Sequence, residues 1–261
     1  MMRVIKSELI RLLRPSFIVG GIGLMAAFGA LATVIGFSAA GQSGAGPAQY
    51  FPSETALAAS DGFVSGLALA SNLVGIVALA FWAIAVASDY GSGLIRLLVQ
   101  AEPKRYRLLM GKLGALLVFT IAGTLAATLA AAGTAYVIAP AMDVSRSAWG
   151  TDTLVTLLEA FRNLSLSTVV WGIIGFTIAT ITRSAGVSIA LGVGYVVVFE
   201  NMLLAIAKDA ADWLPGATLT ALASGGTPTI GFDTAIALGG AYALAGIIIS
   251  SLIVQRREIT Y

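Results

Sequence analysis

The chain contains long intervals without a charged residue, and these constrain its fold more than any other feature. The first interval runs from Ser16 to Ser53, and comparable ones follow along the chain. A helix that crosses about 30 Å of hydrocarbon needs about 20 apolar residues. With 58% apolar and only 11% charged residues, the sequence could not cover a water-facing surface. It therefore predicts an all-α polytopic membrane protein with a single transmembrane domain over residues 1–261.

Six membrane spans are expected from these intervals. Only the fifth has an ionisable side chain well inside it, Glu200. The first apolar run is longer than the roughly 7 to 15 residues of a signal-peptide core, so we expect it to stay as a span. The expected spans cover residues 16–40, 62–88, 112–139, 163–182, 184–207 and 233–254.

The distribution of basic residues predicts the orientation of these spans. Lys and Arg are enriched in the short cytoplasmic loops of membrane proteins. Most of the basic residues lie on one side of the six-span arrangement, namely Arg3, Lys6, Arg11, Arg14, Arg96, Lys104, Arg105, Arg107, Lys112, Arg183, Arg256 and Arg257. We therefore expect a multi-pass protein of a bacterial cytoplasmic membrane with both termini in the cytoplasm. Because membrane orientation explains the net charge of +2, no nucleic-acid partner is expected.

The absence of two residue types limits the chemistry. The sequence has no His and no Cys, which excludes disulfides, imidazole or thiolate metal sites and His-based acid–base catalysis. It also lacks the G-x-x-x-x-G-K-[ST] loop that cradles nucleotide phosphates, because Gly111-Lys112 is followed by Leu113. We therefore expect neither enzymatic activity nor a cofactor or metal site in this chain.

Two segments outside the spans are predicted to be short amphipathic helices. Residues 1–14 carry basic and apolar side chains on opposite faces, which is typical of a helix lying in the headgroup plane, and Pro15 ends it. A second helix after Gly93 combines leucines with Arg96, and Pro103 ends it. Such a helix suits docking of a soluble partner or contact with anionic lipid. A third segment, residues 208–232, is expected to be either re-entrant or a plain external loop.

This arrangement resembles the six-span permease subunits of ATP-binding-cassette exporters, the type-2 permease family. An in-plane helix precedes span one, and an Asp-Trp-Leu-Pro segment precedes span six. After span two comes an ordered series of residues similar to the family's series, namely Asp89, Gly93, Leu97, Leu98, Pro103, Arg105, Gly111 and Lys112. The resemblance covers the whole chain.

The resemblance implies two kinds of partner subunit. A separate nucleotide-binding ATPase subunit would bind ATP and Mg, and a second copy of the chain or a similar permease would complete the pathway. The coupling residues would be Gly93, Arg96, Leu97, Leu98, Glu102, Pro103 and Arg105. The pathway residues would be Asn72, Phe81, Trp82, Tyr195, Glu200 and Asn201.

Two other classes of function compete with this interpretation. An ion-coupled secondary transporter usually pairs several intramembrane ionisable groups, whereas only Glu200 lies within a span here. An intramembrane hydrolase without His or Cys would need a Ser/Lys or paired-aspartate site at depth. No Lys or Asp lies deep in any expected span.

Overall fold

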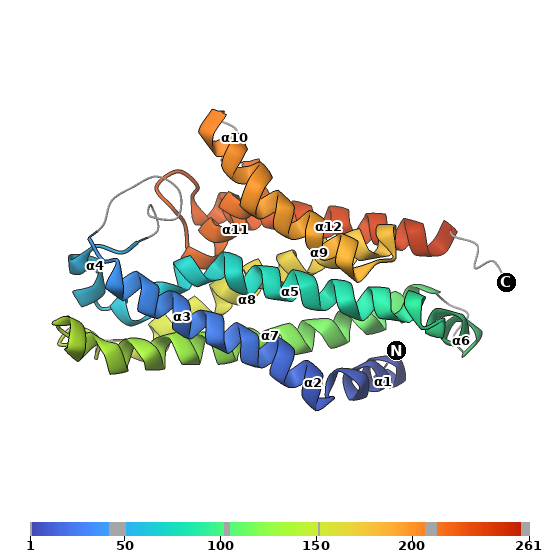
Figure 1. The fold of residues 1–261 in the computed structure, drawn as a ribbon, viewed down its shortest axis with the longest axis horizontal. Helices are drawn as coiled ribbons and strands as arrows, with labels where there is room; N and C mark the ends of the chain where they lie inside the picture. The colour runs from blue at the N-terminus through green and yellow to red at the C-terminus, as the bar shows by residue number, and fades with distance from the viewer. Residues whose placement is uncertain (1, 42–50, 102–104, 151, 207–212, 257–261) are drawn as a thin grey trace.

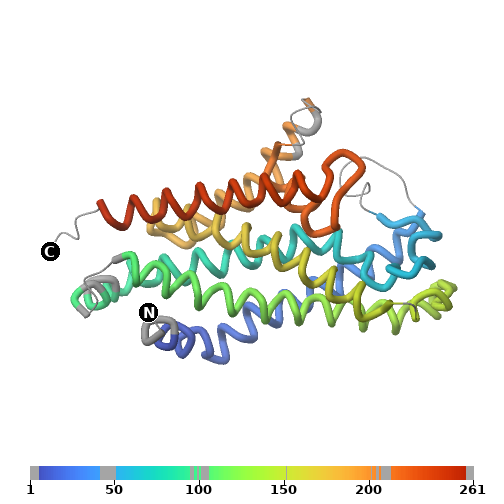
Figure 2. The backbone as a smooth tube through the Cα atoms, turned by 180° about the vertical axis from the view of Figure 1, so that it is seen from behind, coloured from blue at the N-terminus to red at the C-terminus, as the bar shows by residue number. Residues whose placement is uncertain are grey.

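The computed structural model describes residues 2–41, 51–101, 105–150, 152–206 and 213–256 (Figure 1). These residues form helices and connecting turns, and none of them lies in a β-strand. The long helices run side by side along the longest axis of the molecule (Figures 1 and 2). The predicted all-α fold is therefore confirmed.

In the first half of the chain, the helix boundaries fall at the predicted proline and glycine positions. Helix α1 (Met2–Leu12) precedes Pro15, which occupies the first position of α2 (Pro15–Phe17), where a missing backbone N–H costs nothing. A π-helical segment (Ile18–Gly23) then leads into α3 (Leu24–Ser38). The next elements are α4 (Glu54–Ala58), α5 (Gly66–Gly91), α6 (Leu94–Ala101) and α7 (Arg105–Ile138). The predicted amphipathic helix after Gly93 is thus α6.

The second half contains two long helices and several short ones. Its elements are α8 (Thr153–Thr182), α9 (Ala185–Gly194), a second π-helical segment (Tyr195–Glu200), α10 (Asn201–Ile206), α11 (Pro215–Ser224) and α12 (Phe232–Arg256). Figure 1 shows α10 projecting away from the other helices, whereas α11 lies against them. A re-entrant segment can enter the membrane only if its backbone is buried in protein, and α11 is largely buried. Its buried residues are Gly216, Thr218, Leu219, Thr220, Ala221, Leu222 and Ala223.

Five helical stretches within the described residues are long and apolar enough to cross a membrane. They are Pro15–Ser38, Gly62–Gly91, Tyr106–Met142, Thr153–Thr182 and Phe232–Arg256. The stretch expected as span five is a shorter apolar helix, Ala185–Glu200, which at 1.5 Å per residue is about 24 Å long. The chain is therefore a multi-pass membrane protein with five full-length apolar helices in its described part.

Helices α5 and α8 form the centre of the bundle through reciprocal contacts between glycine and tryptophan. Trp171 of α8 packs on Gly75 of α5, where an added Cβ would lie 2.6 Å from the indole nitrogen. Trp82 of α5 packs on Gly172 of α8, where an added Cβ would lie 2.5 Å from Cε2. In lipid the hydrophobic effect does not drive helices together, so helix association depends on close van der Waals packing, which small residues allow. Both indoles are almost fully buried as a result.

The ends of the bundle collect different elements. Helices α1 and α6 and the last turn of α12 lie at one end, and α4 lies at the opposite end (Figures 1 and 2). The first and last described helices, α1 and α12, therefore both reach this end of the bundle (Figure 1). The ion cluster described next lies at the end that carries α1 and α6.

Candidate functional site: an ion cluster beneath α6

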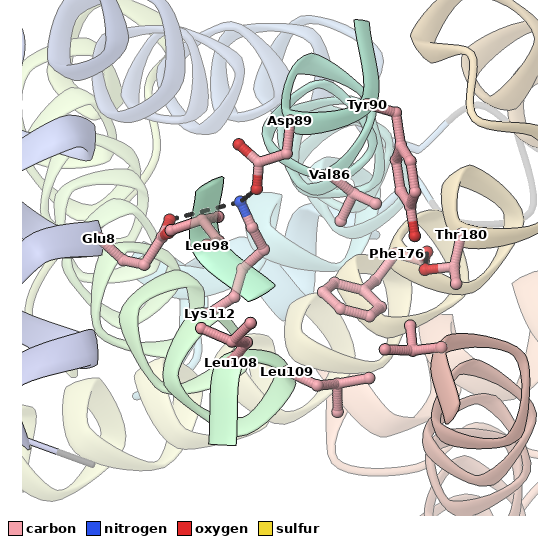
Figure 3. A pocket seen from close by; sticks show the side chains of 11 residues that line it. Glu8, Val86, Asp89, Tyr90, Leu98, Leu108, Leu109, Lys112, Phe176 and Thr180 are labelled. Carbon is pink, nitrogen blue, oxygen red and sulfur yellow. Dashed lines mark hydrogen bonds and ion pairs between the residues drawn. The ribbon is translucent and has the colours of Figure 1, made fainter. Parts of the chain in front are cut away.

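Four charged side chains from three separated helices meet where α5 gives way to α6. Lys112 of α7 forms ion pairs with Asp89 of α5 and with Glu8 of α1, the latter at 3.3 Å. Figure 3 shows the Lys112 amine between these two carboxylates. Arg11 of α1 contacts the same two acids, at 3.0 Å from Glu8 and 2.6 Å from Asp89. The Lys112 amine also donates to the carbonyl oxygen of Ala85 at 2.9 Å.

The charged side chains of this cluster are buried and therefore need oppositely charged partners. The relative exposure is 5% for Glu8 and 2% for Asp89, and the Lys112 side chain is 12% exposed. A buried carboxylate without a cation is strongly unfavourable, so each acid needs its partners. Burial alone lowers the pKa of Arg11, but the hydrogen bond and charge of Asp89, together with Glu8, outweigh it and raise that pKa. With two acids and two bases, the cluster is neutral and ties α1 to both helices that flank α6.

Helix α6 is connected to this cluster by a tight turn and one leucine. Gly93 has a φ of +69°, a left-handed conformation that favours glycine, and it breaks the chain away from α5. Leu98 lines the same small cavity as Glu8, Asp89 and Lys112 (Figure 3). Leu97 is 63% exposed. One face of α6 therefore contacts the cluster, while another presents a leucine outward.

The remaining predicted coupling residues fall where side chains are not described. The backbones of Arg96 and Arg105 lie in α6 and at the start of α7. Glu102 and Pro103 lie outside the described residues. The third long helix begins at Arg105, earlier than the predicted start at residue 112, so Lys112 lies about two turns inside it. Because Lys112 lies inside the helix, its amine is level with Asp89.

Glu200 occupies a second buried polar site, at the opposite end of the α9 stretch. Its carboxylate accepts hydrogen bonds from the backbone N–H groups of Gly216 (3.0 Å) and Ala217 (2.6 Å) at the start of α11. Glu200 is only 4% exposed. These N–H groups have no partner within the helix, and the helix dipole there favours a negative charge. Glu200 therefore fixes α11 to the π-helical end of the α9 stretch.

The other predicted pathway residues have varied surroundings. Phe81 stacks on Phe119 with ring centroids 4.1 Å apart, and Trp82 donates from Nε1 to the Thr120 hydroxyl at 2.8 Å. Both are buried in the core between α5, α7 and α8. Tyr195 is half-buried and lines an apolar groove of about 700 Å³ between α9 and α12.

Asn72 and Asn201 complete the predicted pathway set. The Asn72 Oδ1 atom is buried and accepts no hydrogen bond from the described residues. Asn201 begins α10, and its side chain lies outside the described part. The structure thus separates the pathway set into core residues (Phe81, Trp82) and residues of the α9–α11 region (Tyr195, Glu200).

Sequence reasoning missed Glu8, although a signal for it was present. It is the single acidic residue within the basic segment 1–14, and it stands three residues before Arg11, a spacing that places both on one helix face. An acid at that spacing on an amphipathic helix predicts an intrahelical pair. Its second partner, Lys112, is remote in sequence and could not be named from local spacing.

The described residues include no group of three or more Asp, Glu, His or Cys side chains that could hold a metal ion. No curated protein matches the chain. A family model does match it, over residues 31–260, which is most of its length. The chain therefore belongs to the family described as "Protein of unknown function (DUF2705)".

Proposed function

We propose that this chain is the membrane subunit of an ATP-driven exporter and works as a dimer with separate ATPase subunits. The ATPase subunits would bind ATP and Mg, and α6 would transmit their movement to the spans. The pathway would lie between two membrane subunits, either two copies of this chain or this chain and a similar permease. The α9–α11 region with Tyr195, Glu200 and Asn201 would face it. Phe81 and Trp82 would support that pathway through packing.

The ion cluster is the observation that carries this proposal. A docking helix transmits force only if it is anchored to the elements that must move. Asp89 and Lys112 stand at the two ends of the α5–α6–α7 connection and pair with each other, which closes the connection at its base. Glu8 and Arg11 add α1 to the same anchor. A push on α6 would therefore reach three helices together.

An ion-coupled carrier is less well supported by the surroundings of Glu200. A coupling carboxylate must exchange its ion or proton with the pathway. Both Glu200 oxygens instead accept hydrogen bonds from α11, and the side chain is buried. Purification of the native complex separates the two functions. A stoichiometric ATPase subunit supports the exporter, whereas a lone oligomer with proton-gradient-dependent flux contradicts it.

Replacement of Leu97 and Arg105 by alanine should uncouple the two subunits. Burial of a leucine side chain in an interface contributes about 1.5 to 3 kcal/mol, so affinity for the ATPase subunit should fall at least about tenfold. Co-purification and substrate-stimulated ATP turnover measure this loss. Leu129→Ala removes an exposed leucine from α7, which is 51% exposed against 63% for Leu97, and is the control. Normal stimulation in the double variant would refute the role of α6.

Single cysteines should report the proposed six-span topology, because the natural chain has no thiol. Ser147 and Ser92 are both exposed and lie on connections expected on opposite sides of the membrane. In intact cells a membrane-impermeant maleimide should label Ser147→Cys and leave Ser92→Cys unlabelled until the membrane is permeabilised. Labelling of Ser92→Cys in intact cells would place α6 outside and rule out the exporter.

A further inference from the structure

A second cavity lies beside the ion cluster, between α1 and the α5–α6 turn. It encloses about 440 Å³ and is separate from the small cavity under Leu98. Its basic lining comes from Arg11, Arg14 and Lys112, and Glu8 is the one acid that lines it. The cavity thus has an excess of positive charge on its walls.

The ion pairs of the cluster show which basic side chain of the cavity has no acidic partner. Glu8 and Asp89 are balanced by Arg11 and Lys112, all within ion-pairing distance. Arg14 lines the same cavity and is exposed, and its guanidinium forms no ion pair or hydrogen bond with the described residues, whereas its backbone carbonyl accepts from Phe17 and Ile18. One positive charge therefore faces the cavity without a protein counter-charge. A ligand with one net negative charge would complete the site.

The walls indicate the rest of the ligand. Leu12, Phe17 and Leu97 supply apolar surface, and the hydroxyl-bearing Ser88 and Ser92 stand at the polar side. Arg14 lies between the amphipathic α1 and Pro15, where the first apolar stretch begins. We expect the boundary between headgroups and hydrocarbon at this point, because the amphipathic helix ends and the apolar stretch begins here, and a juxtamembrane cation at that depth attracts anionic lipid.

We propose that this cavity binds one phospholipid with an anionic headgroup. The phosphate accepts hydrogen bonds from the Arg14 guanidinium, and an acyl chain follows Phe17 toward the hydrocarbon. A zwitterionic lipid fits poorly, because its ammonium group would meet Arg11 and Lys112, while the carboxylates of Glu8 and Asp89 are already paired. The site depends on membrane embedding; it shares Leu97 with the proposed ATPase-docking face, but its cation, Arg14, belongs to the lipid site alone.

Lipid retention by the purified full-length chain tests this site. The chain is incorporated into nanodiscs of phosphatidylglycerol and phosphatidylcholine, extracted in mild detergent, and its bound lipids are counted by native mass spectrometry. The wild type should retain phosphatidylglycerol in excess. Arg14→Gln should lower that occupancy about fivefold, as expected for one cation at the membrane surface. Arg14→Lys should restore most of it.

Lys6→Gln is the matched control, because Lys6 is an exposed cation of α1 that does not line the cavity. It should leave the bound lipid unchanged. Equal losses in the Lys6 and Arg14 variants, or no preference for phosphatidylglycerol in the wild type, would overturn the site. Displacement of the lipid by millimolar inorganic phosphate would also overturn it, because the cavity would then be a simple anion site. Thermal melting of each variant confirms that the fold is intact.

Discussion

Replacement of Lys112 by methionine should release α1 from the bundle. Two buried carboxylates, Glu8 and Asp89, would then share Arg11 alone. Removal of one partner from a buried ion cluster costs about 3 to 5 kcal/mol, so the fraction of molecules with α1 detached should rise by a factor on the order of 100 to 5,000. A cysteine in place of the buried Leu12 measures this, because it reacts with maleimide only when α1 leaves its seat.

Charge balance provides the sharpest control for that experiment. Lys112→Met combined with Glu8→Gln leaves the Arg11–Asp89 pair, and should recover much of the protection of the Leu12 position. Lys6→Met removes an exposed cation from the same helix and should change nothing. If Lys112→Met keeps wild-type protection, or if the double variant is worse than the single one, the cluster does not anchor α1.

Gly216→Ala should free α11 from the end of the α9 stretch. An added Cβ would lie 2.5 Å from the Glu200 carboxyl carbon, so the carboxylate would have to move away from both N–H groups. Overpacking and the loss of two buried hydrogen bonds should together destabilise this contact by about 2 to 4 kcal/mol. A cysteine at the buried Thr220 of α11 should then become reactive, and the melting temperature in detergent should fall.

Gly240→Ala is the matched control for the glycine substitution. Gly240 lies within α12, and no heavy atom lies near the position of an added Cβ. This change should leave Thr220→Cys protected and should raise helix stability by up to about 1 kcal/mol. Glu200→Gln should fall between Gly216→Ala and the wild type, because its amide oxygen can still accept from one N–H. Equal behaviour of the two glycine variants would mean that Glu200 does not fix α11.

Local sequence signals predicted two of the helices outside the long spans, α1 and α6. Pro15 and Gly93 mark real boundaries, because proline fits the first turn of a helix and glycine reaches the left-handed region at a helix end. Charge-free length also identified five of the long apolar helices. The fifth expected span is less regular than its composition suggests, because the π-helical segment Tyr195–Glu200 interrupts it. Composition does not encode such an interruption.

The partners of the functional candidates could not be predicted in the same way. Glu8 and Lys112 are about a hundred positions apart, and the donors to Glu200 are backbone N–H groups of α11 that have no sequence signature. Phe81 and Trp82 illustrate another limit. When all faces of a helix are apolar, the sequence does not distinguish the face toward a neighbouring helix from the face toward a pathway. Their burial against α7 and α8 required the structure.

The interlocked indoles of Trp82 and Trp171 restrict how this molecule could change shape. Each ring sits in a notch of the opposite helix, so α5 and α8 cannot slide along each other unless both rings are withdrawn. Any movement that begins at α6 should therefore carry this pair as one rigid lever. The bending would fall to the two outer helices whose backbones already depart from regular α geometry, at Ile18–Gly23 and Tyr195–Glu200.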